Sequence, residues 1–354
     1  MMTMNDISVR ARVSTATVSH VINQTTYVSP ALRERVVKAI REFNYHPNSV
    51  ARTLKTKKSK TVGMIIPDIT NPFFPAVVRG AEDVLRHEGY TLILGNSDGD
   101  LQKEELYYRT FLTKRVDGIL LIVSPSPSLP QYLRQHNPDG LAIVYVDRFH
   151  RGVRGDVVTV NNVKGSYEGV SHLLARGHRR TAIITGPLEL INARQRLEGY
   201  RRALKAHHIR VVDELIRPGN FDVESGYEQT KYLLSLSNPP TAIFVSNARM
   251  TTGCLRAFRD LGVKCPEDVA VVSFDDMEWF ELSWPSITAV AQPAYKLGAT
   301  AAELLVKRFS GRLSGSPCRK FLPTKLIVRE SSARGRKRTF KLVGKDRNPK
   351  GVLR

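Results

Sequence analysis

Residues 3–23 (TMNDISVRARVSTATVSHVIN) decide how the N-terminal part of the chain folds. Their apolar residues fall at roughly helical spacing in two short groups: Ile7, Val9, Ala11 and Val13, then Val18, Val21 and Ile22. Ser14 stands between the groups and predicts a helix N-cap, because its hydroxyl can accept a hydrogen bond from a free amide of the turn it precedes. The stretch therefore predicts two short helices separated by a tight break.

The outward face of the second predicted helix carries small side chains, hydroxyls, an amide and one imidazole: Thr15, Ala16, Ser19, His20 and Asn23. Arg10 and Arg12 flank this face. Such groups beside arginines suit a helix that enters the major groove of DNA. From these residues alone, a solvated surface helix is an equally good interpretation, so the choice depends on the rest of the chain.

The net charge of the 354-residue chain, +21, is concentrated at its two ends. Residues 1–60 hold 11 Lys and Arg against 3 Asp and Glu, and residues 332–354 hold 9 against 1. The 271 residues between them contribute only +5. Two basic ends on a nearly balanced centre indicate a polyanionic partner at the ends and a different task for the centre.

The sequence contains no apolar run long enough to span a bilayer and no apolar signal segment at its N-terminus. Three cysteines, Cys254, Cys265 and Cys318, are too widely spaced to indicate a metal site or a disulfide framework. We therefore expect a soluble, cytoplasmic protein that has no membrane partner.

The segment after the first two helices continues the helical pattern. Residues 29–45 predict a third helix that begins at Ser29-Pro30. Residues 48–55 predict a fourth, whose apolar stripe is too narrow to fold alone and which forms only against a partner. Residues 55–60 (KTKKSK) predict a linker, and residues 332–354 lack periodicity and predict a disordered basic tail.

From Thr61 onward, short apolar runs alternate with amphipathic helices, which is typical of parallel sheets covered on both faces. Nine runs predict strands: 61–67, 90–96, 116–123, 141–147, 156–161, 181–186, 241–246, 269–275 and 287–293. Nine strands are more than one ordinary sheet carries. We therefore expect an α/β fold with two doubly wound lobes and a cleft between them.

Polar and aromatic residues follow many of these strands, at the edge where open parallel sheets bind ligands. Acids, amides and arginines can each engage two adjacent hydroxyls, and phenyl rings cover the C–H face of a small ring. The set favours a polyol or sugar over a nucleotide or fatty acid, although each residue alone could simply cap a helix. The predicted ligand-binding residues are Asn71, Phe73, Phe74, Ser124, Asp147, Arg148, Arg194, Arg196, Phe221, Asn247, Asp275 and Gln292.

Catalysis finds little support in the sequence. It lacks a nucleophile elbow, a phosphate-binding glycine loop, a dinucleotide fingerprint, and the HExxH and CxxC motifs. Asp147 or Asp275 could act as an acid or base, but neither has an obvious partner. We expect no enzyme activity, no cofactor and no metal.

Three N-terminal motifs resemble the DNA-binding headpiece of LacI/GalR-type bacterial repressors: VSTATVSHVIN (13–23), VSPALRERVVKAI (28–40) and YHPNSVARTLK (45–55). Residues 61 to about 330 resemble the effector domain of that family, which is similar to periplasmic sugar-binding proteins. Within the family, TVSHVIN (17–23) is most similar to the purine-repressor and ribose-repressor types.

The resemblance implies that Thr15, Ala16 and His20 read bases, and that Leu54, with Lys55 beside it, is a wedge in the minor groove. The predicted DNA-binding residues are Thr15, Ala16, Thr17, Ser19, His20, Asn23, Leu54 and Lys55. The resemblance also implies a ribose-type site in the cleft, with Arg196 at a sugar-contact position. Two-fold pairing on a palindromic operator is expected, because one headpiece contacts too few bases for genomic specificity.

Three positions depart from the family pattern. Ala248 follows Asn247 where the family commonly has an acid, and Ser124 stands where ribose-binding relatives tend to place an amide. Thr26 stands where purine-type repressors have a base-contacting arginine. These departures leave the sugar and the operator open.

We therefore predict a transcriptional repressor of a catabolic operon that binds double-stranded operator DNA as a homodimer. A small sugar such as ribose controls it allosterically, and a purine is the less favoured effector. Its predicted parts are a helix-turn-helix headpiece (1–47), a hinge (48–60), a two-lobed effector and dimerisation domain (61–331) and a basic tail (332–354). The alternatives are a sugar-binding transport protein and a metabolic enzyme on the same fold.

Overall fold

A computed structural model of the chain describes residues 2–23, 26–45, 58–126, 128–137, 140–150, 153 and 155–333. The chain divides into two compact units, Met1–Ser59 and Lys60–Arg354. The predicted hinge residues Leu54 and Lys55 lie outside the described residues, as does the predicted tail from residue 334 onward.

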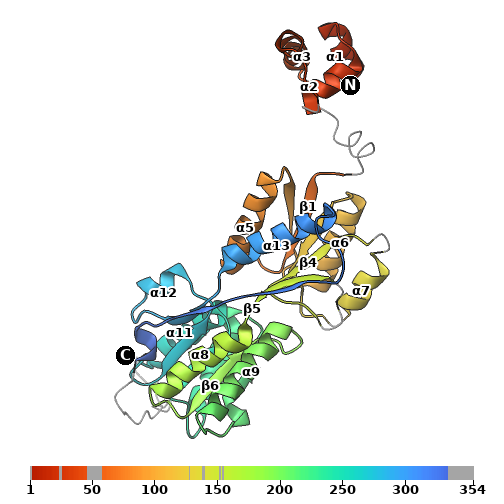
Figure 1. Cartoon of the computed structure of the whole chain (residues 1–354). Coiled ribbons are helices and arrows are strands. Elements are labelled where there is room, and N and C mark those ends of the chain that lie inside the picture. Colours follow the sequence, from red (N-terminus) through yellow and green to blue (C-terminus); the bar gives the residue numbers. More distant parts are fainter. Residues whose placement is uncertain are drawn as a thin grey trace, which may run out of the picture. The chain divides into compact units, whose positions relative to one another are not determined.

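The first unit contains three helices, α1 (Met4–Ala11), α2 (Thr15–Asn23) and α3 (Pro30–Glu42) (Figure 1). A capping box starts α1, in which the Asp6 amide donates to Thr3 Oγ1 and the Thr3 amide donates to Asp6 Oδ2. The Thr17 amide donates to Ser14 Oγ at 3.1 Å, which confirms the predicted cap of α2. The three helices enclose a small core: Ile7, Ala11, Val18, Val21, Val36 and Ala39.

Val9, one of the apolar residues of the first helical group, does not face this core, because its side chain is 71% exposed. Val9 lies two positions from both Ile7 and Ala11. Two positions on an α-helix correspond to about 200°, so a residue between two inward-facing neighbours points to the opposite side.

The second unit consists of two α/β lobes, and each lobe contains a six-stranded sheet. The N-terminal lobe has strand order β11-β5-β4-β3-β1-β2, entirely parallel. Its strands are β1 (Thr61–Ile66), β2 (Thr91–Asn96), β3 (Gly118–Leu121), β4 (Ile143–Val146), β5 (Asp156–Val160) and β11 (Arg319–Leu322). Its helices are α5 (Phe73–His87), α6 (Leu101–Thr113), α7 (Leu129–Gln135) and α13 (Ala294–Phe309).

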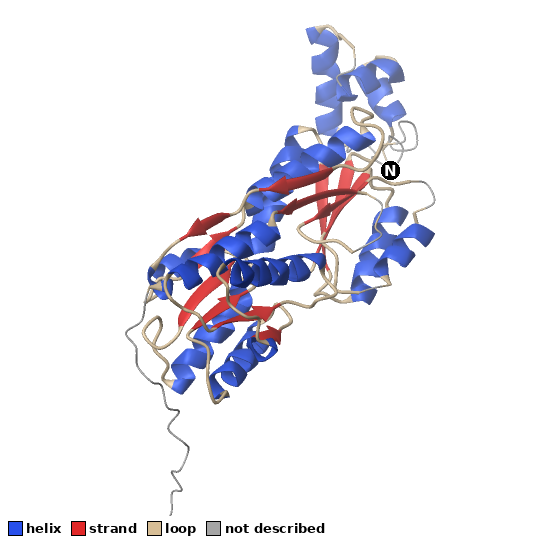
Figure 2. Ribbon diagram, turned by 60° about the horizontal axis from the view of Figure 1, so that its bottom comes forward, coloured by secondary structure: helices blue, strands red, loops and turns tan. Residues whose placement is uncertain are grey.

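The C-terminal lobe has strand order β12-β10-β9-β8-β6-β7, in which only β12 runs antiparallel to its neighbour among the described strands. Its strands are β6 (Thr181–Thr185), β7 (Ile216–Pro218), β8 (Ala242–Val245), β9 (Ala270–Phe274), β10 (Thr288–Ala291) and β12 (Lys325–Ile327). Its helices are α8 (Asn162–Ala175), α9 (Ile191–Ala206), α10 (Val223–Ser235), α11 (Ala248–Leu261) and α12 (Glu278–Leu282), with short turns η1 (Asp213–Leu215) and η2 (Glu330–Ser332). Figure 2 shows helices lying along both sheets.

The predicted two-lobed architecture is confirmed, and all nine predicted strands are present. The sequence interpretation missed β7, β11 and β12. These three are short edge strands with partly exposed or exposed residues, so they lack the continuous apolar run that identifies a buried parallel strand. The predicted boundary of the tail is also shifted, because Ser332 is buried in η2 and hydrogen-bonds with His172 and Thr288.

The chain passes between the lobes three times, after β5, after β10 and after β11. The second passage returns α13 to the N-terminal lobe, where it packs beside α5 (Figure 1). Glycines allow this close approach, since a Cβ at Gly80 would lie 2.0 Å from the Tyr295 carbonyl oxygen and one at Gly298 would lie 1.8 Å from that of Val77. This topology brings the residues that follow β1, β4, β8, β9 and β10 to one cavity.

Candidate functional site

Helix α2 presents a small polar surface. Thr15, Ala16 and Asn23 are exposed, while Thr17, Ser19 and His20 are partly exposed. Local hydrogen bonds engage two of these side chains: Thr17 Oγ1 lies 2.9 Å from Ser14 Oγ, and Asn23 Nδ2 donates to the Ser19 carbonyl at 2.9 Å. Thr15 and Ala16 therefore occupy the exposed N-terminal turn, which is the part of a recognition helix that reaches base edges.

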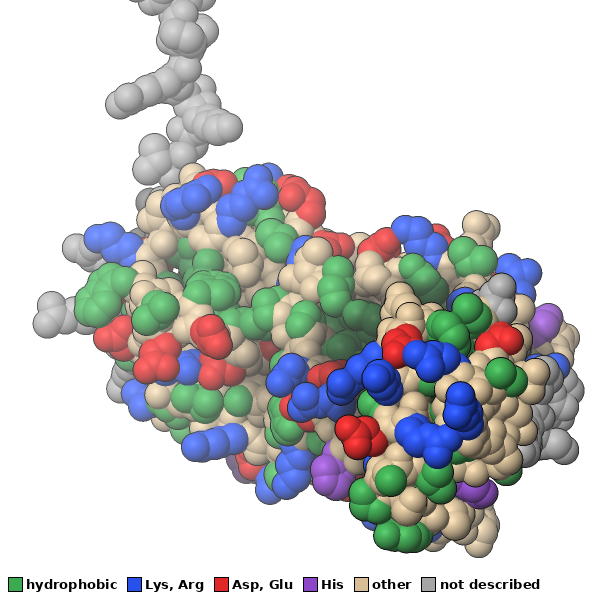
Figure 3. All heavy atoms as spheres, turned by 90° about the horizontal axis from the view of Figure 1, so that it is seen from above, with side chains coloured by type: hydrophobic (Ala, Val, Ile, Leu, Met, Phe, Trp, Pro, Cys, Tyr) green, Lys and Arg blue, Asp and Glu red, His purple; other side chains and the backbone are tan. Residues whose placement is uncertain are grey.

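The other two helices of the first unit carry exposed cations, at the end of α1 and along α3: Arg10, Arg12, Arg33, Arg35, Lys38 and Arg41. Only two of these have a described partner, since Arg10 pairs with Glu42 at 2.8 Å and Arg35 donates to the Arg12 carbonyl. Figure 3, which looks from above, shows Lys and Arg side chains gathered on one part of the surface. Exposed cations beside a polar helix face are the electrostatic footprint of a protein that binds nucleic acid.

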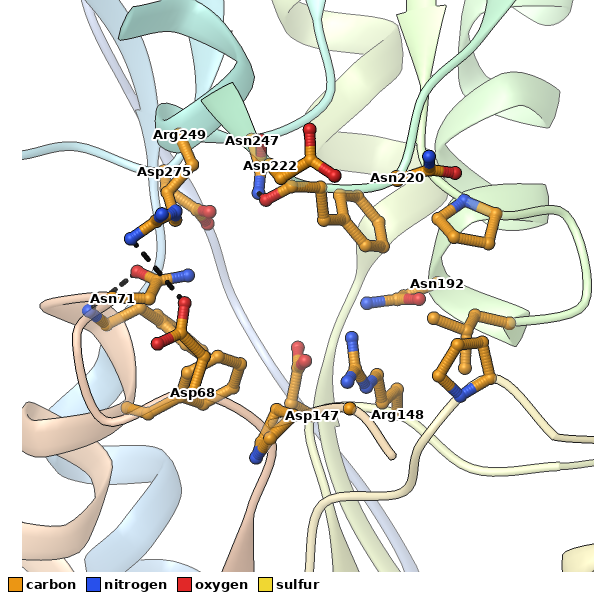
Figure 4. A pocket seen from close by; sticks show the side chains of 18 of the residues that line it. Asp68, Asn71, Asp147, Arg148, Asn192, Asn220, Asp222, Asn247, Arg249 and Asp275 are labelled. Atoms are coloured by element: carbon orange, nitrogen blue, oxygen red, sulfur yellow. Dashed lines mark hydrogen bonds and ion pairs between the residues drawn. The ribbon is translucent and has the colours of Figure 1, made fainter. Parts of the chain in front are cut away.

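A cavity of about 530 Å³ lies between the two lobes (Figure 4). Ten of the twelve predicted ligand-binding residues line it: Asn71, Phe73, Phe74, Asp147, Arg148, Arg196, Phe221, Asn247, Asp275 and Gln292. They come from both lobes, so a small molecule in the cavity would contact both at once.

Each lobe contributes one buried acid at an equivalent place. Asp147 follows β4 and Asp275 follows β9, and both adopt left-handed backbone with φ of 62° and 71°. This conformation is uncommon for residues other than glycine and often marks functional sites. In the view of Figure 4, the Asp147 carboxylate points into the cavity.

Two buried guanidinium groups accompany the acids. The Nε of Arg148 donates to the Val123 carbonyl at 2.7 Å, and Arg148 also lines the cavity. Arg196 donates to Asn162 Oδ1 at 2.9 Å and to the Ser246 carbonyl at 2.6 Å, and its Cζ lies 3.8 Å from the centroid of the Phe274 ring. These contacts fix the direction of both donors before any ligand arrives.

The acids retain hydrogen-bonding capacity toward the cavity. Asp147 Oδ1 and Gln292 Oε1 are buried acceptors without a hydrogen-bond partner among the described residues. Asp275 Oδ1 accepts from Gln292 Nε2 at 2.5 Å. Burial raises the pKa of Asp147 to about 6 and that of Asp275 above its usual range, although Arg196 opposes both shifts. Buried acceptors of this kind require donors, and sugar hydroxyls can supply them.

The cavity also includes residues that the sequence interpretation missed: Asp68, Thr70, Asp98, Asn192, Asn220, Asp222 and Arg249. Figure 4 shows Asn192 and Asn220 on the side of the pocket opposite Asp68 and Arg249. Arg249 extends from α11 in the C-terminal lobe to the β1–α5 loop, where it lies 3.5 Å from Asp68 Oδ2 and donates to Thr70 Oγ1 at 3.0 Å. Arg249 therefore bridges the cleft, and it directly follows Ala248, the residue that stands where an acid was expected.

Two predicted ligand residues, Ser124 and Arg194, do not line the cavity. The Ser124 hydroxyl is fully buried and donates to the Glu104 carboxylate on α6. Arg194 donates to the Leu188 carbonyl and lies two positions from Arg196 on α9, so the two side chains point to different sides of the helix. Asn247 lines the cavity but also caps α11 and donates to the Phe221 carbonyl at 2.9 Å.

In the described part of the chain, no group of three or more His, Cys, Asp or Glu residues is placed to hold a metal ion. None of the described helices is long and apolar enough to cross a membrane.

Comparison with known proteins identifies both parts of the chain. Residues 3–48 match the bacterial regulatory proteins of the lacI family, and residues 170–332 match the periplasmic binding protein-like domain. The ribose operon repressor of Escherichia coli (strain K12) is 37% identical over 310 residues, which cover 88% of this chain and 94% of that protein. The repressor CytR of the same organism is 34% identical over 330 residues, which cover 93% and 96%.

Solved structures show the same relationship. The lac repressor dimer bound to operator and the anti-inducer ONPF has a TM-score of 0.83 at 27% identity and covers 94% of this chain and 99% of that one. The complex of the transcriptional regulator CelR with cellobiose has a TM-score of 0.71 at 33% identity and covers 94% and 100%.

The headpiece, the two-lobed domain and these relatives together define a DNA-binding transcriptional repressor with an effector-binding domain. The chain belongs to the lacI family of bacterial regulatory proteins. The expected family is thereby confirmed, and the transport-protein alternative is excluded, since the matched full-length relatives are transcriptional repressors rather than transport proteins or enzymes.

Proposed function

We propose that this protein represses a catabolic operon from the bacterial cytoplasm and that a small polyol of the ribose type, bound between its lobes, controls it. The observation that carries the proposal is the convergence of Asp147, Arg148, Arg196, Asp275 and Gln292 on one cavity. Two of these residues, Asp147 and Gln292, have a buried acceptor without a hydrogen-bond partner among the described residues. Phe73, Phe74 and Phe221 add flat apolar faces beside these groups. A relative at 37% identity is named for the ribose operon.

Calorimetric titration with a panel of pentoses, hexoses and purines tests the identity of the effector. We expect D-ribose or a close pentose to bind most tightly, since the cavity offers both acids and guanidiniums, which can each engage neighbouring hydroxyls. Purine binding without pentose binding would show that the ring-stacking residues, rather than the charged ones, select the ligand. No heat with any member of the panel would refute a polyol site.

We propose that the two-lobed domain forms the homodimer. Leu282, the last residue of α12, is 85% exposed, and Trp284, two positions further on, is 91% exposed; Trp279 on α12 is exposed as well. Large apolar side chains gathered on one surface mark an interaction site, and a matched structure is a repressor dimer on operator DNA. Replacing Trp284 with Lys should shift the sedimentation coefficient toward that of a monomer, and an unchanged coefficient would refute this interface.

We propose that α2 reads the operator with Thr15, Ala16 and His20, aided by contacts from Thr17, Ser19 and Asn23. The proposed hinge, residues 48–60, would place Leu54 and Lys55 on the same DNA, and the basic tail would add non-specific affinity. Protection of a palindromic DNA fragment by the purified protein, measured with and without D-ribose, tests both the operator and the direction of control. Identical protection in the two conditions would refute control by this sugar.

A further inference from the structure

Glu104 is a buried carboxyl group directly behind the wall of the cavity. It belongs to α6 and is only 1% exposed. Its Oε2 accepts hydrogen bonds from the Ser124 amide at 2.7 Å and from the Ser124 hydroxyl. Its Oε1 is buried and has no hydrogen-bond partner among the described residues. Ionisation of a buried carboxyl with so few hydrogen-bond donors costs free energy, which indicates a specific role for this side chain.

The segment after β3 connects Glu104 to the cavity. The Val123 carbonyl accepts from Arg148 Nε at 2.7 Å, and His150 Nε2 lies 2.8 Å from the Ser124 carbonyl oxygen. The same two residues, Val123 and Ser124, are therefore held by Glu104 on one side and by the loop after β4 on the other. Because Arg148 lines the cavity, a displacement of this segment would move a ligand donor.

The charges of this region do not balance. Three buried carboxyls, Glu104, Asp147 and Asp275, accompany two buried guanidiniums, Arg148 and Arg196, and none of the five is more than 6% exposed. With all five ionised, this group would have a net charge of −1 in a region shielded from water, which is unfavourable. One retained proton removes the excess charge. Burial raises the pKa of all three carboxyls, but Arg196 stabilises the charge of Asp147 and that of Asp275. The Glu104 carboxylate accepts from Ser124 alone among the described residues, so we assign the retained proton to Glu104.

We propose that Glu104 is a positioning residue for the effector, acting through Ser124 and Arg148, and that effector binding is coupled to release of its proton. The proposal rests on the proposed function, since it concerns the same cleft. A ligand that fills the cavity displaces water from around Arg148 and strengthens its attraction for the Glu104 carboxylate. The ionised form is then favoured in the complex, and the released proton passes to the solvent. Linkage requires binding to tighten as pH rises through the titration of Glu104.

Asp147 also titrates near this pH range, since burial raises its pKa to about 6, and Glu104→Gln separates the two contributions because it leaves Asp147 in place. The remaining titratable groups near Glu104 do not produce the same effect. Burial raises the pKa of Tyr108 to about 12 and also raises those of Tyr132 and Tyr145, so all three stay neutral near pH 7. Burial lowers the pKa of His150 below its usual range, which keeps it mostly neutral. Glu105, the neighbour of Glu104 on α6, raises the pKa of Glu104 slightly.

Calorimetry with D-ribose at pH 6, 7 and 8, in two buffers of different ionisation enthalpy, measures both affinity and proton release. If ribose does not bind, the tightest ligand of the panel takes its place. We expect wild-type affinity to rise about three- to tenfold from pH 6 to pH 8, since one unit of pKa change corresponds to at most a tenfold change in affinity. Proton release should be largest near pH 7.

Glu104→Gln should flatten this dependence, because glutamine resembles the protonated acid in shape and charge. Its affinity at every pH should match that of the wild type at pH 6. The matched control Glu105→Gln alters the adjacent carboxyl and should keep the wild-type slope. Circular dichroism verifies that each variant is folded.

Ser124→Ala provides a second test if Glu104→Gln does not fold. Removing a donor to the ionised carboxylate raises the pKa of Glu104 further, so the midpoint of the pH dependence should move to higher pH. The role of Glu104 is refuted if ligand affinity in Glu104→Gln depends on pH as strongly as in the wild type, or if the midpoint of that dependence does not move in Ser124→Ala. Either result leaves the proposed function intact. Failure of every panel ligand to bind refutes the proposed function, and the role of Glu104 falls with it.

Discussion

Asp275 provides the most direct test of the cleft, because its charge can be removed while its backbone is preserved. Its side chain lies in the cavity and accepts from Gln292, and its charge faces that of Arg196. Its φ of 71° restricts which residues fit, and asparagine tolerates left-handed backbone better than most. Asp275→Asn therefore removes the charge, whereas Asp275→Ala removes both the charge and the hydrogen-bonding atoms.

The expected loss follows from two contributions. A hydrogen bond between a ligand hydroxyl and a charged group contributes about 1.5–3 kcal/mol, and a buried donor left without its acceptor adds about 1–3 kcal/mol. Because these contributions overlap, we expect Asp275→Ala to lose about 2–4 kcal/mol of binding free energy, or about 30- to 1,000-fold in Kd. Asp275→Asn should lose less, since the amide still offers an acceptor.

Isothermal titration with the best ligand of the panel measures this loss. Asp276→Asn is the matched control, because the Asp276 carboxylate pairs with Arg329 at 2.7 Å instead of lining the cavity. The control should lower the thermal unfolding temperature but leave Kd unchanged. If Asp275→Ala binds the ligand as tightly as the wild type does, the effector does not contact Asp275 and the proposed site is wrong.

Three further predictions concern other parts of the molecule. His20→Ala should change which operator is preferred, whereas Lys58→Ala should weaken all DNA binding alike, as selection from a randomised operator library would show. Arg249→Ala should weaken effector binding no more than about fivefold, since its cross-cleft pair is about one-third exposed, while Arg256→Ala on the same helix should have no effect. In the folded protein the pKa of Glu104 is raised from 4.5 to about 7. The wild type should therefore lose stability relative to Glu104→Gln as pH rises through that interval, by up to about 3 kcal/mol in urea unfolding. A stability difference that does not change with pH would refute the raised pKa of Glu104.

The sequence predicted many residues of the cleft correctly, because their side chains come directly after strands that were themselves predictable. Asp147 and Asp275 each come directly after a continuous apolar run, so the rule that ligands meet the carboxyl ends of parallel strands was sufficient. The rule does not specify which way each side chain points. Ser124 also follows a strand, yet its hydroxyl is directed to Glu104 behind the wall, and periodicity alone could not show this.

The residues that were missed depend on contacts between distant segments. Arg249 lies two positions after Asn247, but its role arises only when α11 faces the β1–α5 loop of the other lobe. Asn192 lies in the first turn of α9, and Asn220 follows β7, a short edge strand that has no continuous apolar run to identify it in the sequence. The sequence signal available was indirect: Arg249 stands next to Ala248, the position at which an expected acid is absent.

The energetics of the cleft indicate what the effector must do. The Arg249–Asp68 pair is too exposed to contribute more than about 1 kcal/mol, which shifts an open–closed equilibrium about fivefold. Reversing a 1:99 equilibrium requires about 5.5 kcal/mol of differential affinity, so most of it must come from a ligand that contacts Asp147 in one lobe and Asp275 in the other. A ligand held by one lobe alone would bind without regulating.

If closure changes operator affinity, operator DNA must change ribose affinity by the same factor, because the coupling is reciprocal. Titrating ribose with and without a saturating operator fragment measures one factor, and titrating operator with and without ribose measures the other. A factor of one in both titrations would show that closure of the cleft does not link the two sites.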